Sequence, residues 1–564
     1  MSDSSKKQNF LHGAALLALA TAVVKIIGAL YKIPLKMIIG DIGFSYFSVS
    51  YQIYSVLLMV CTAGLPIAMS RMISRANTLA NYGQVRQVYR VSYRIFLWLG
   101  VGGTALMCLL CKPLANAMGY PDAWFAILCL GPCALLMCLL AAYRGYFQGQ
   151  ENMRPTSNSQ MLEAFIKLIV GLAAALALIS VTGLESFAAG GAILGVTVSC
   201  LVSVIYLRRK FRADYRQLPN TGSAEGSMGS TAKQLLAIAI PITIGSAGLY
   251  LLTAVETGVY TNRLVDLIES NQYTLPLAAS LKEQLLAEGV AAADLSGKVA
   301  ASLNGIYSFG QTIFNMPCAF IVPITISIIP AITAKLTRQE DRKVRQIEES
   351  AARITGLLSL PCSVGLALLA SPIMSLLGGY GDERNPFAAQ VMIYLGASVC
   401  LYAIIQYTNA LLQAHGYAHV PVITMLSCGV VKLAVVYILA GNPHIGIMAA
   451  PIATILCYAA ISVLNLLCIR KLIPQKPKLL SNLLRSLPSA VIMGAAVFGT
   501  YYALTEFMHL SIRSTLHSAI LCAVPIGVGV IVYLISASVT RAITRDDCEL
   551  LPKGDKIAKL LHLH

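Results

Sequence analysis

The sequence is poor in charged residues, which occupy 12% of its 564 positions, while apolar residues occupy 57%. A soluble domain carries about 25% charged residues, so this composition excludes a water-soluble protein. The phosphate-binding pattern GxxxxGK[ST] is absent, which excludes a transport ATPase. The CxxC of Cys108 and Cys111 has no second cysteine pair and no histidine nearby, and this argues against a zinc or redox site.

Apolar runs of bilayer-spanning length are the main feature that is present. The first run follows Lys6 and Lys7 as a signal peptide would, but its length, its internal Lys25 and the lack of a clear cleavage site predict a retained helix. We predict fourteen transmembrane helices, at about 10–36, 43–70, 91–111, 123–147, 160–182, 187–207, 234–262, 301–334, 352–379, 388–413, 420–440, 446–469, 486–506 and 516–538.

Basic residues are distributed unequally between alternate loops. Of the 42 Lys and Arg residues, 31 fall on the side that holds both termini, 7 fall on the opposite side and four lie within spans. Because loops rich in Lys and Arg stay in the cytoplasm, we expect both termini to be cytoplasmic in a multi-pass protein of the cell membrane. This distribution explains the net charge of +17 without a nucleic-acid partner.

A Gly/Ser-rich stretch separates the first six spans from the rest. The segment at about 264–300, on the opposite side, contains neither His nor Cys, so it offers little for an enzyme site, and we expect one or two short surface helices there. The predicted fold is an all-α integral membrane protein with an N-lobe at 1–211, a flexible cytoplasmic linker at 212–232, a C-lobe at 233–471, two further helices within 472–538 and a cytoplasmic tail at 539–564.

The two groups of six spans share a local sequence repeat. At one constant offset along the chain, Gln148 corresponds to Gln413 and Lys167 to Lys432. Two parallel six-helix lobes are typical of transporters that hold their substrate between the lobes.

Six charged side chains fall inside predicted spans, where each costs roughly 2.5–3.5 kcal/mol unless it meets a partner or a wet cavity. Lys25 and Lys32 form one helical stripe with Gly28, Ala29 and Lys36. We predict that Lys25 and Lys32 line a cavity, and that Lys36 anchors the helix at the outer interface.

The other four in-span charges allow more than one interpretation. Glu163 and Lys167 are spaced for a helical ion pair, but Lys167 and its repeat mate Lys432 are also candidates for substrate binding. Glu256 is either a coupling site for H⁺ or Na⁺ or a counter-ion to a lysine. Together the in-span charges are net positive, which suits an anion such as a phosphate group.

Three segments, at 25–74, 143–168 and 314–333, resemble the polysaccharide biosynthesis and stage V sporulation protein B family, Gram-positive relatives of MurJ-type lipid II flippases in the MOP exporter superfamily. The resemblance implies a MATE-like fold of two lobes plus two C-terminal helices. It also implies alternating-access transfer of an undecaprenyl-pyrophosphate-linked oligosaccharide or muropeptide, such as lipid II, from the inner to the outer leaflet. It implies no cofactor, with transport coupled to H⁺, to Na⁺ or to the membrane potential.

The same resemblance places Lys25 and Lys32 where the family has basic residues on its first helix, although Gram-negative MurJ-type proteins more often carry Arg there. One alternative is a multidrug or cation antiporter of the MATE type, which needs cavity carboxylates that the first span lacks. A second alternative, a membrane glycan ligase or polymerase, needs a catalytic loop, and the largest outer loop lacks histidine. We therefore expect a transporter and not an enzyme.

Overall fold

The computed structural model describes residues 3–219, 221–224, 226–475, 477–512, 514–540 and 542. The description excludes the side chains of residues 3–22, 25, 26, 245, 246, 249, 323, 324, 326, 327, 330, 331 and 334. The side chain of Lys25 and nearly all of the predicted tail at 539–564 therefore lie outside the described residues.

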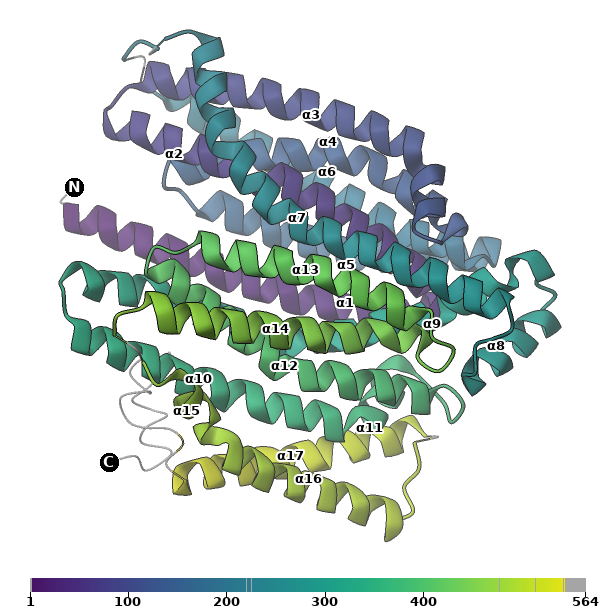
Figure 1. Cartoon of the computed structure of the whole chain (residues 1–564). Helices are drawn as coiled ribbons and strands as arrows, with labels where there is room; N and C mark the ends of the chain where they lie inside the picture. Colours follow the sequence, from purple (N-terminus) through teal and green to yellow (C-terminus); the bar gives the residue numbers. More distant parts are fainter. Residues whose placement is uncertain are drawn as a thin grey trace. The chain divides into compact units, whose positions relative to one another are not determined.

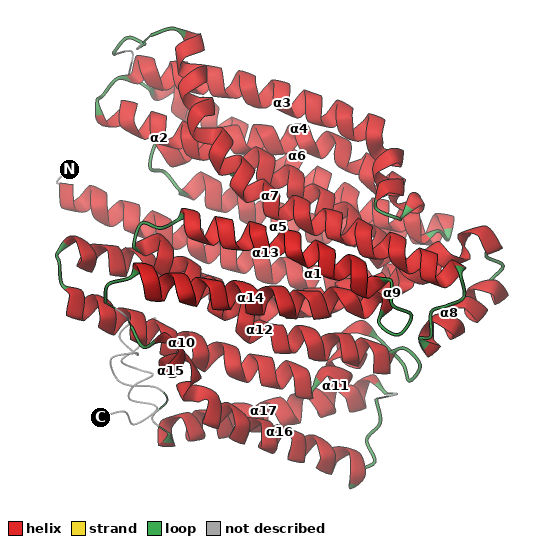
Figure 2. Cartoon of the chain, in the orientation of Figure 1, coloured by secondary structure: helices red, strands yellow, loops and turns green. Residues whose placement is uncertain are grey.

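Helices make up almost all of the described chain, and no strand occurs there (Figure 2). This result confirms the predicted fold class, because a helix satisfies its own backbone hydrogen bonds in lipid. Eleven segments of the described chain are long and apolar enough to cross a membrane. The first of them, Ile27–Thr78, contains the end of the predicted span 10–36 and the whole of the predicted span 43–70. Two further predicted spans lie in the long helices α7 (Met228–Glu269) and α9 (Ala292–Thr337), which include positions outside the described side chains.

The helices form two compact units. The first unit contains residues Met1–Ser270 and Leu286–Gly305. Besides α7 and part of α9, its helices (Figure 1) are α1 (Asp3–Thr62), α2 (Leu65–Thr78), α3 (Tyr82–Ala117), η1 (Pro121–Ala123), α4 (Trp124–Gly149), α5 (Arg154–Thr182) and α6 (Glu185–Gln217). Within it, α5 packs on α1 and α6, α4 packs on α3 and α6, and α7 packs on α1, α2 and α3.

The second unit contains residues Asn271–Leu285 and Ile306–His564. Its helices, besides part of α9, are α8 (Pro276–Ala287), α10 (Asp341–Leu368), α11 (Ala370–Gly378), α12 (Asn385–Ala414), α13 (His419–Ala440), η2 (Gly446–Met448), α14 (Ala449–Leu472), α15 (Leu479–Leu483), η3 (Leu484–Ser486), α16 (Leu487–Glu506) and α17 (Thr515–Val539). Within the unit, α10 packs on α12, α12 packs on α14, and α16 lies beside α17 (Figure 1).

The boundary between the first two predicted spans is a kink inside α1. Gly40 adopts φ 68°, a conformation that favours glycine, and the helix changes direction there. The Lys36 ammonium lies 3.4 Å from the Asp41 carboxylate, and both side chains are more than nine-tenths buried. The prediction that Lys36 anchors the outer interface was therefore wrong, because a carboxylate on the far side of the kink holds the lysine inside the first unit.

The second predicted span, 43–70, is interrupted, because α1 ends at Thr62 and α2 begins at Leu65. Between them, Gly64 lies so close to α7 that a methyl group added there would overlap the carbonyl oxygen of Ala239. Pro66 in the first turn of α2 favours a helix start at this point. The break therefore combines a helix-start signal with close packing against α7.

The predicted linker at 212–232 is helical at both of its ends, 212–217 and 228–232. Helix α6 continues to Gln217 because Phe211 stacks on Tyr89 with ring centroids 4.3 Å apart. Asp214, one turn further along, accepts a 2.7 Å hydrogen bond from the Tyr146 hydroxyl. Helix α7 begins at Met228, so the described residues of the non-helical connection are 218, 219, 221–224, 226 and 227. The packing places α7 in the first unit, whereas the predicted lobes assigned this helix to the second group.

Candidate functional site

Two predicted site lysines meet over one aromatic ring inside the first unit. Lys32 on α1 and Lys167 on α5 come from helices that pack against each other. The Lys32 ammonium lies 5.2 Å and the Lys167 ammonium 5.7 Å from the centroid of the Tyr51 ring. We call Lys32, Lys167, Tyr31 and Tyr51 the lysine–tyrosine cluster.

The second tyrosine of the cluster, Tyr31, is fixed by neighbouring helices. The Lys167 ammonium lies 6.0 Å from the Tyr31 ring centroid. The Tyr31 hydroxyl donates a 3.2 Å hydrogen bond to the carbonyl oxygen of Ala192 on α6. Gly171 on α5 leaves the space that this tyrosine occupies, because a methyl group there would fall 2.6 Å from the hydroxyl. The Tyr31 ring is thus held in position before any ligand binds.

Neither lysine of the cluster forms an ion pair with a carboxylate in the described part of the chain. Both side chains are half-buried, so each keeps some access to solvent. A cation over an aromatic face gains about 0.5–2 kcal/mol. This cation–π energy does not cancel the Coulomb repulsion between the Lys32 and Lys167 ammonium groups. An anion bound between the two groups would offset that repulsion.

Glu163 pairs with Arg144 and not with Lys167, the partner that the i, i+4 spacing had suggested. Its Oε2 atom lies 2.9 Å from Nη2 of Arg144 on α4, and Nε of Arg144 donates a 3.0 Å hydrogen bond to Ser159. The i, i+4 ion pair between Glu163 and Lys167 does not form, because the guanidinium occupies the carboxylate. This arrangement leaves Lys167 free to face the two tyrosine rings.

The other predicted site residues lie elsewhere. The backbone of Lys25 belongs to α1, two turns before Lys32, but its side chain is outside the described residues. Glu256 is a buried residue of α7. Lys432 is a half-buried residue of α13 in the second unit. The structure therefore brings together Lys32 and Lys167 and leaves the roles of the other residues untested.

The proposed sequence repeat has a structural counterpart at one corner. Helix α5 begins at Arg154 and α13 begins at His419, and the offset between these starts equals the offset between Gln148 and Gln413. Lys167 and Lys432 consequently occupy the same position in their two helices, counted from the first residue.

Sequence reasoning missed three residues around the cluster: Tyr31, Tyr51 and Arg144. Tyr51 follows Lys32 on the far side of the Gly40 kink, and Arg144 lies on a different helix from its partner Glu163. Helical spacing relates residues on one straight helix only. The one available signal was the pair of polar aromatic residues at 31 and 51 on the first two predicted spans.

Comparison with known protein families gives two overlapping matches. The family described as "Polysaccharide biosynthesis protein" matches residues 10–336, and the family described as "Lipid II flippase MurJ" matches residues 286–518. The first match covers more than half of the chain.

Three proteins of Bacillus subtilis (strain 168) are similar to the chain over nearly its whole length. The uncharacterized membrane protein YabM is 26% identical over 99% of this chain and 97% of its own. Lipid II flippase MurJ is 22% identical over 93% of this chain and 94% of its own. Stage V sporulation protein B is 22% identical over 97% of this chain and 98% of its own.

Solved structures support the fold. Lipid II flippase MurJ in an inward closed conformation aligns with a TM-score of 0.60 at 14% identity, covering 93% of this chain and 98% of that one. A multidrug resistance MATE family transporter of the MOP superfamily, in an inward-facing conformation, aligns with a TM-score of 0.61 at 14% identity, covering 80% of this chain and 97% of that one. At these identities the likeness concerns the fold alone.

Proposed function

Because the chain belongs to the polysaccharide biosynthesis protein family, we propose that it is a flippase for a lipid-linked glycan. Its substrate is an undecaprenyl-pyrophosphate-linked precursor, either lipid II or a related polysaccharide precursor, carried from the inner to the outer leaflet of the cell membrane. The full-length similarity to a lipid II flippase and to a stage V sporulation protein supports this proposal. On this proposal the chain is a transporter and not an enzyme.

The observation that carries the proposal is the lysine–tyrosine cluster. Two ammonium groups face one ring, with no ion-paired carboxylate on either lysine in the described part of the chain. A pyrophosphate carries negative charge on several oxygens, so each lysine gains a charge-assisted hydrogen bond when it binds. Flexible lysine stems follow a moving phosphate without imposing one fixed geometry.

We infer that transport proceeds by alternating access, with the pyrophosphate on Lys32 and Lys167 and the lipid tail in the bilayer. Lys25 precedes Lys32 by seven residues in the sequence, the spacing of two helical turns, so it remains a further candidate for phosphate binding. The membrane potential favours the outward direction, because carrying two negative charges to the positive side across about 100 mV yields roughly 4–5 kcal/mol.

A cation antiporter of the MATE type shares the fold but receives less support from the cluster. Such a transporter needs a free carboxylate to attract its substrate. Glu163, the acidic side chain nearest in sequence to Lys167, is already paired with Arg144. Uncompensated lysines repel organic cations, so the cluster favours an anionic passenger.

The direct test replaces Lys32 and Lys167 separately by Ala and measures movement of labelled lipid-linked precursor in liposomes. We expect each change to reduce transport about ten- to hundredfold, because a hydrogen bond to a charged group contributes about 1.5–3 kcal/mol. Lys112→Ala is the matched control, because that ammonium also lies over an aromatic ring, 5.5 Å from the centroid of Trp124, but outside the cluster. Full transport by both cluster variants at normal expression would remove the cluster from the mechanism.

A further inference from the structure

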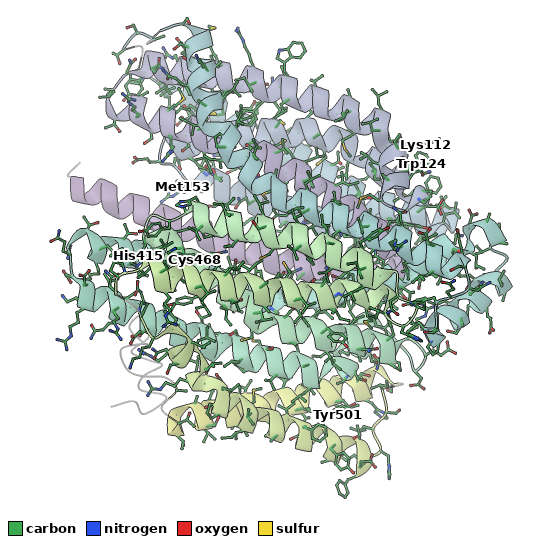
Figure 3. The ribbon with its side chains drawn as sticks, in the orientation of Figure 1. Lys112, Trp124, Met153, His415, Cys468 and Tyr501 are labelled. Carbon is green, nitrogen blue, oxygen red and sulfur yellow. The ribbon has the colours of Figure 1, made fainter. Side chains whose placement is uncertain are left out.

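A buried acid–base pair lies in the second unit, whereas Lys32 and Lys167 belong to the first. Oε1 of Glu348 on α10 lies 2.6 Å from Nε2 of His415. His415, labelled in Figure 3, follows the last residue of α12. The side chain of Glu348 is fully buried and that of His415 is 6% exposed. The two atoms are within hydrogen-bond distance, and the bond is charge-assisted when His415 is protonated.

Both members of the pair are held in place by the ends and turns of their helices. His415 caps α12, and its backbone N–H donates a 3.2 Å hydrogen bond to the carbonyl oxygen of Leu411. Gly416 then turns the chain with φ 86°, a conformation that favours glycine. Between α12 and α10, the Tyr407 hydroxyl donates a 2.7 Å hydrogen bond to the backbone carbonyl oxygen of Glu348. The pair is therefore a fixed element of the α10–α12 contact.

The surroundings of the pair are apolar. Tyr407 and Ala414 belong to a buried cluster that also contains Ile332, Leu411 and Ile469. The second carboxylate oxygen of Glu348 is buried and has no hydrogen-bond partner among the described residues. A polar atom in this condition normally has a partner, so the site has unused capacity to bind a proton.

The charged groups on α10 are largely engaged with other residues. Arg345 pairs with Glu349 at 2.9 Å, which leaves that carboxylate compensated. Arg353 donates hydrogen bonds to Asn482, at 3.1 Å, and to Ser350, at 2.9 Å.

Other elements packed on α10 and α12 also carry titratable and charged groups; on η3, which packs on α10, Arg485 is exposed. Tyr407 on α12 is hydrogen-bonded to the backbone of Glu348, and His419 on α13 packs on the ring of Tyr417. On α14, Cys468 is half-buried, whereas Arg470 is exposed. His415 is therefore the titratable side chain that meets the Glu348 carboxylate directly.

The equivalent corner of the first unit lacks this chemistry. At the same offset that relates α5 to α13, the counterpart of His415 is Gln150, which caps α4 as His415 caps α12. An uncharged side chain thus completes the same helix end, so the local fold does not require a histidine. At this pair of equivalent helix ends, the second unit has a titratable histidine and the first unit has an uncharged glutamine.

A pair that shares one proton is electrically neutral. Losing that proton, or gaining a second one, leaves a net charge in an apolar core, which is costly until water enters. Exchange of that proton therefore needs water to reach the pair, which the packing of α10 on α12 excludes in this structure. Such behaviour links protonation to conformation.

We propose that Glu348 and His415 form a proton-binding site whose loading and release accompany the conformational cycle of transport. The ligand is H⁺, held as one proton between Oε1 of the carboxylate and Nε2 of the imidazole. The coupling half of this proposal rests on the proposed transport function, whereas proton binding itself does not.

Proton binding is tested on the full-length protein in liposomes adsorbed to a solid support, without any substrate. A jump in proton concentration displaces charge when protons enter or leave a buried site, and the transient current measures that charge. We expect the wild type and the control Glu349→Gln to give the transient, and Glu348→Gln and His415→Gln to lose most of it. Glu349→Gln removes a neighbouring carboxylate from the same helix, and His415→Gln copies the residue found at the equivalent corner.

Two results would overturn the proposal: a wild type without the transient, or a Glu348→Gln variant that keeps all of it. Size-exclusion profiles identify any variant that fails to fold, and Glu348→Asp, which keeps the acid, replaces Glu348→Gln in that case and must restore part of the transient.

Coupling is tested next by imposing a pH gradient at zero membrane potential and following labelled lipid-linked precursor. We expect the gradient to change the wild-type transport rate severalfold and to have no effect in His415→Gln. An equal response in the two proteins would refute the coupling. A proton transient without any lipid movement would leave the proton site intact and refute the proposed flippase function instead.

Discussion

Tyr51 contributes an aromatic face where a carboxylate would have cancelled the charge of the lysines. The ring holds two ammonium groups at 5.2 and 5.7 Å from its centroid while leaving both of them positive. A carboxylate at the same place would bind one lysine tightly and compete with a phosphate. The tyrosine therefore positions the cations without occupying the site.

Replacing Tyr51 by Leu is expected to reduce transport of lipid-linked precursor about fivefold, because each cation over the ring gains roughly 0.5–1 kcal/mol. Tyr51→Phe keeps the ring and is expected to retain most of the activity. The liposome assay measures both variants. Equal activity of Leu and Phe at position 51 would show that the ring does not position the lysines.

At the scale of secondary-structure elements, the kink in α1 lies where this helix contacts α9. Asp41, just after the kink, pairs with Lys36, and its carbonyl oxygen lies against Gly305 on α9. A helix can approach another this closely only where it has no side chain. The kink and this contact with α9 therefore occur at the same place in the first unit.

Gly305→Ala is expected to lower the free energy of unfolding by about 1–3 kcal/mol, the usual cost of overpacking. The added methyl group overlaps the Asp41 carbonyl oxygen, and backbone cannot move aside as a flexible side chain can. Gly297→Ala on the same helix is the matched control, because no atom lies within 4 Å of its added methyl group. Thermal unfolding of the purified proteins measures the difference, and equal melting temperatures would contradict the packing argument.

The connection between α9 and α10, which lies outside the membrane spans, makes a pH-dependent contribution to the stability of the folded protein. Hydrogen bonds from Lys343 and Lys335 hold the pKa of Glu340 below its ordinary value. A carboxyl group with a lowered pKa in the folded state stabilises the protein above its ordinary pKa, and this contribution is lost as pH falls through the folded-state value. The effect is small, because the Glu340 side chain is only partly buried and solvent screens its charge.

Glu340→Gln is expected to lower the melting temperature slightly at neutral pH and to have no effect in acid, where Glu340 is protonated in both states. Thermal unfolding of wild type and variant over a pH series checks this expectation. A difference that stays constant down to acidic pH would mean that the ion pairs with Lys335 and Lys343 contribute nothing.

At the scale of the whole molecule, the proposed passenger carries negative charge across the membrane. A liposome potential that is positive on the destination side is expected to speed precursor movement, and the opposite potential to slow it. Two charges gain about 2.3 kcal/mol each per 100 mV, so the effect saturates only when another step limits the rate. Potassium diffusion potentials of both signs provide the measurement, and a rate independent of the sign would exclude net charge movement.

The amino-acid sequence alone determined that this protein lies in a membrane and that its fold is all-α. It also determined approximately where the transmembrane spans fall. Hydrophobicity and charge distribution act along the chain, so these properties are local and can be read without any tertiary contact. The same is true of Lys32 and Lys167, whose cost in lipid marks them as functional candidates wherever the helices pack.

Only the tertiary structure decided which charges are compensated. Lys36 meets Asp41 across a kink, Glu163 meets Arg144 from another helix, and Glu348 meets His415 at the end of a third. These partners are not related by the spacing of a single straight helix, so no periodicity reveals them. Burial and partner choice depend on distances between segments far apart in the chain, and those distances exist only after the helices have packed.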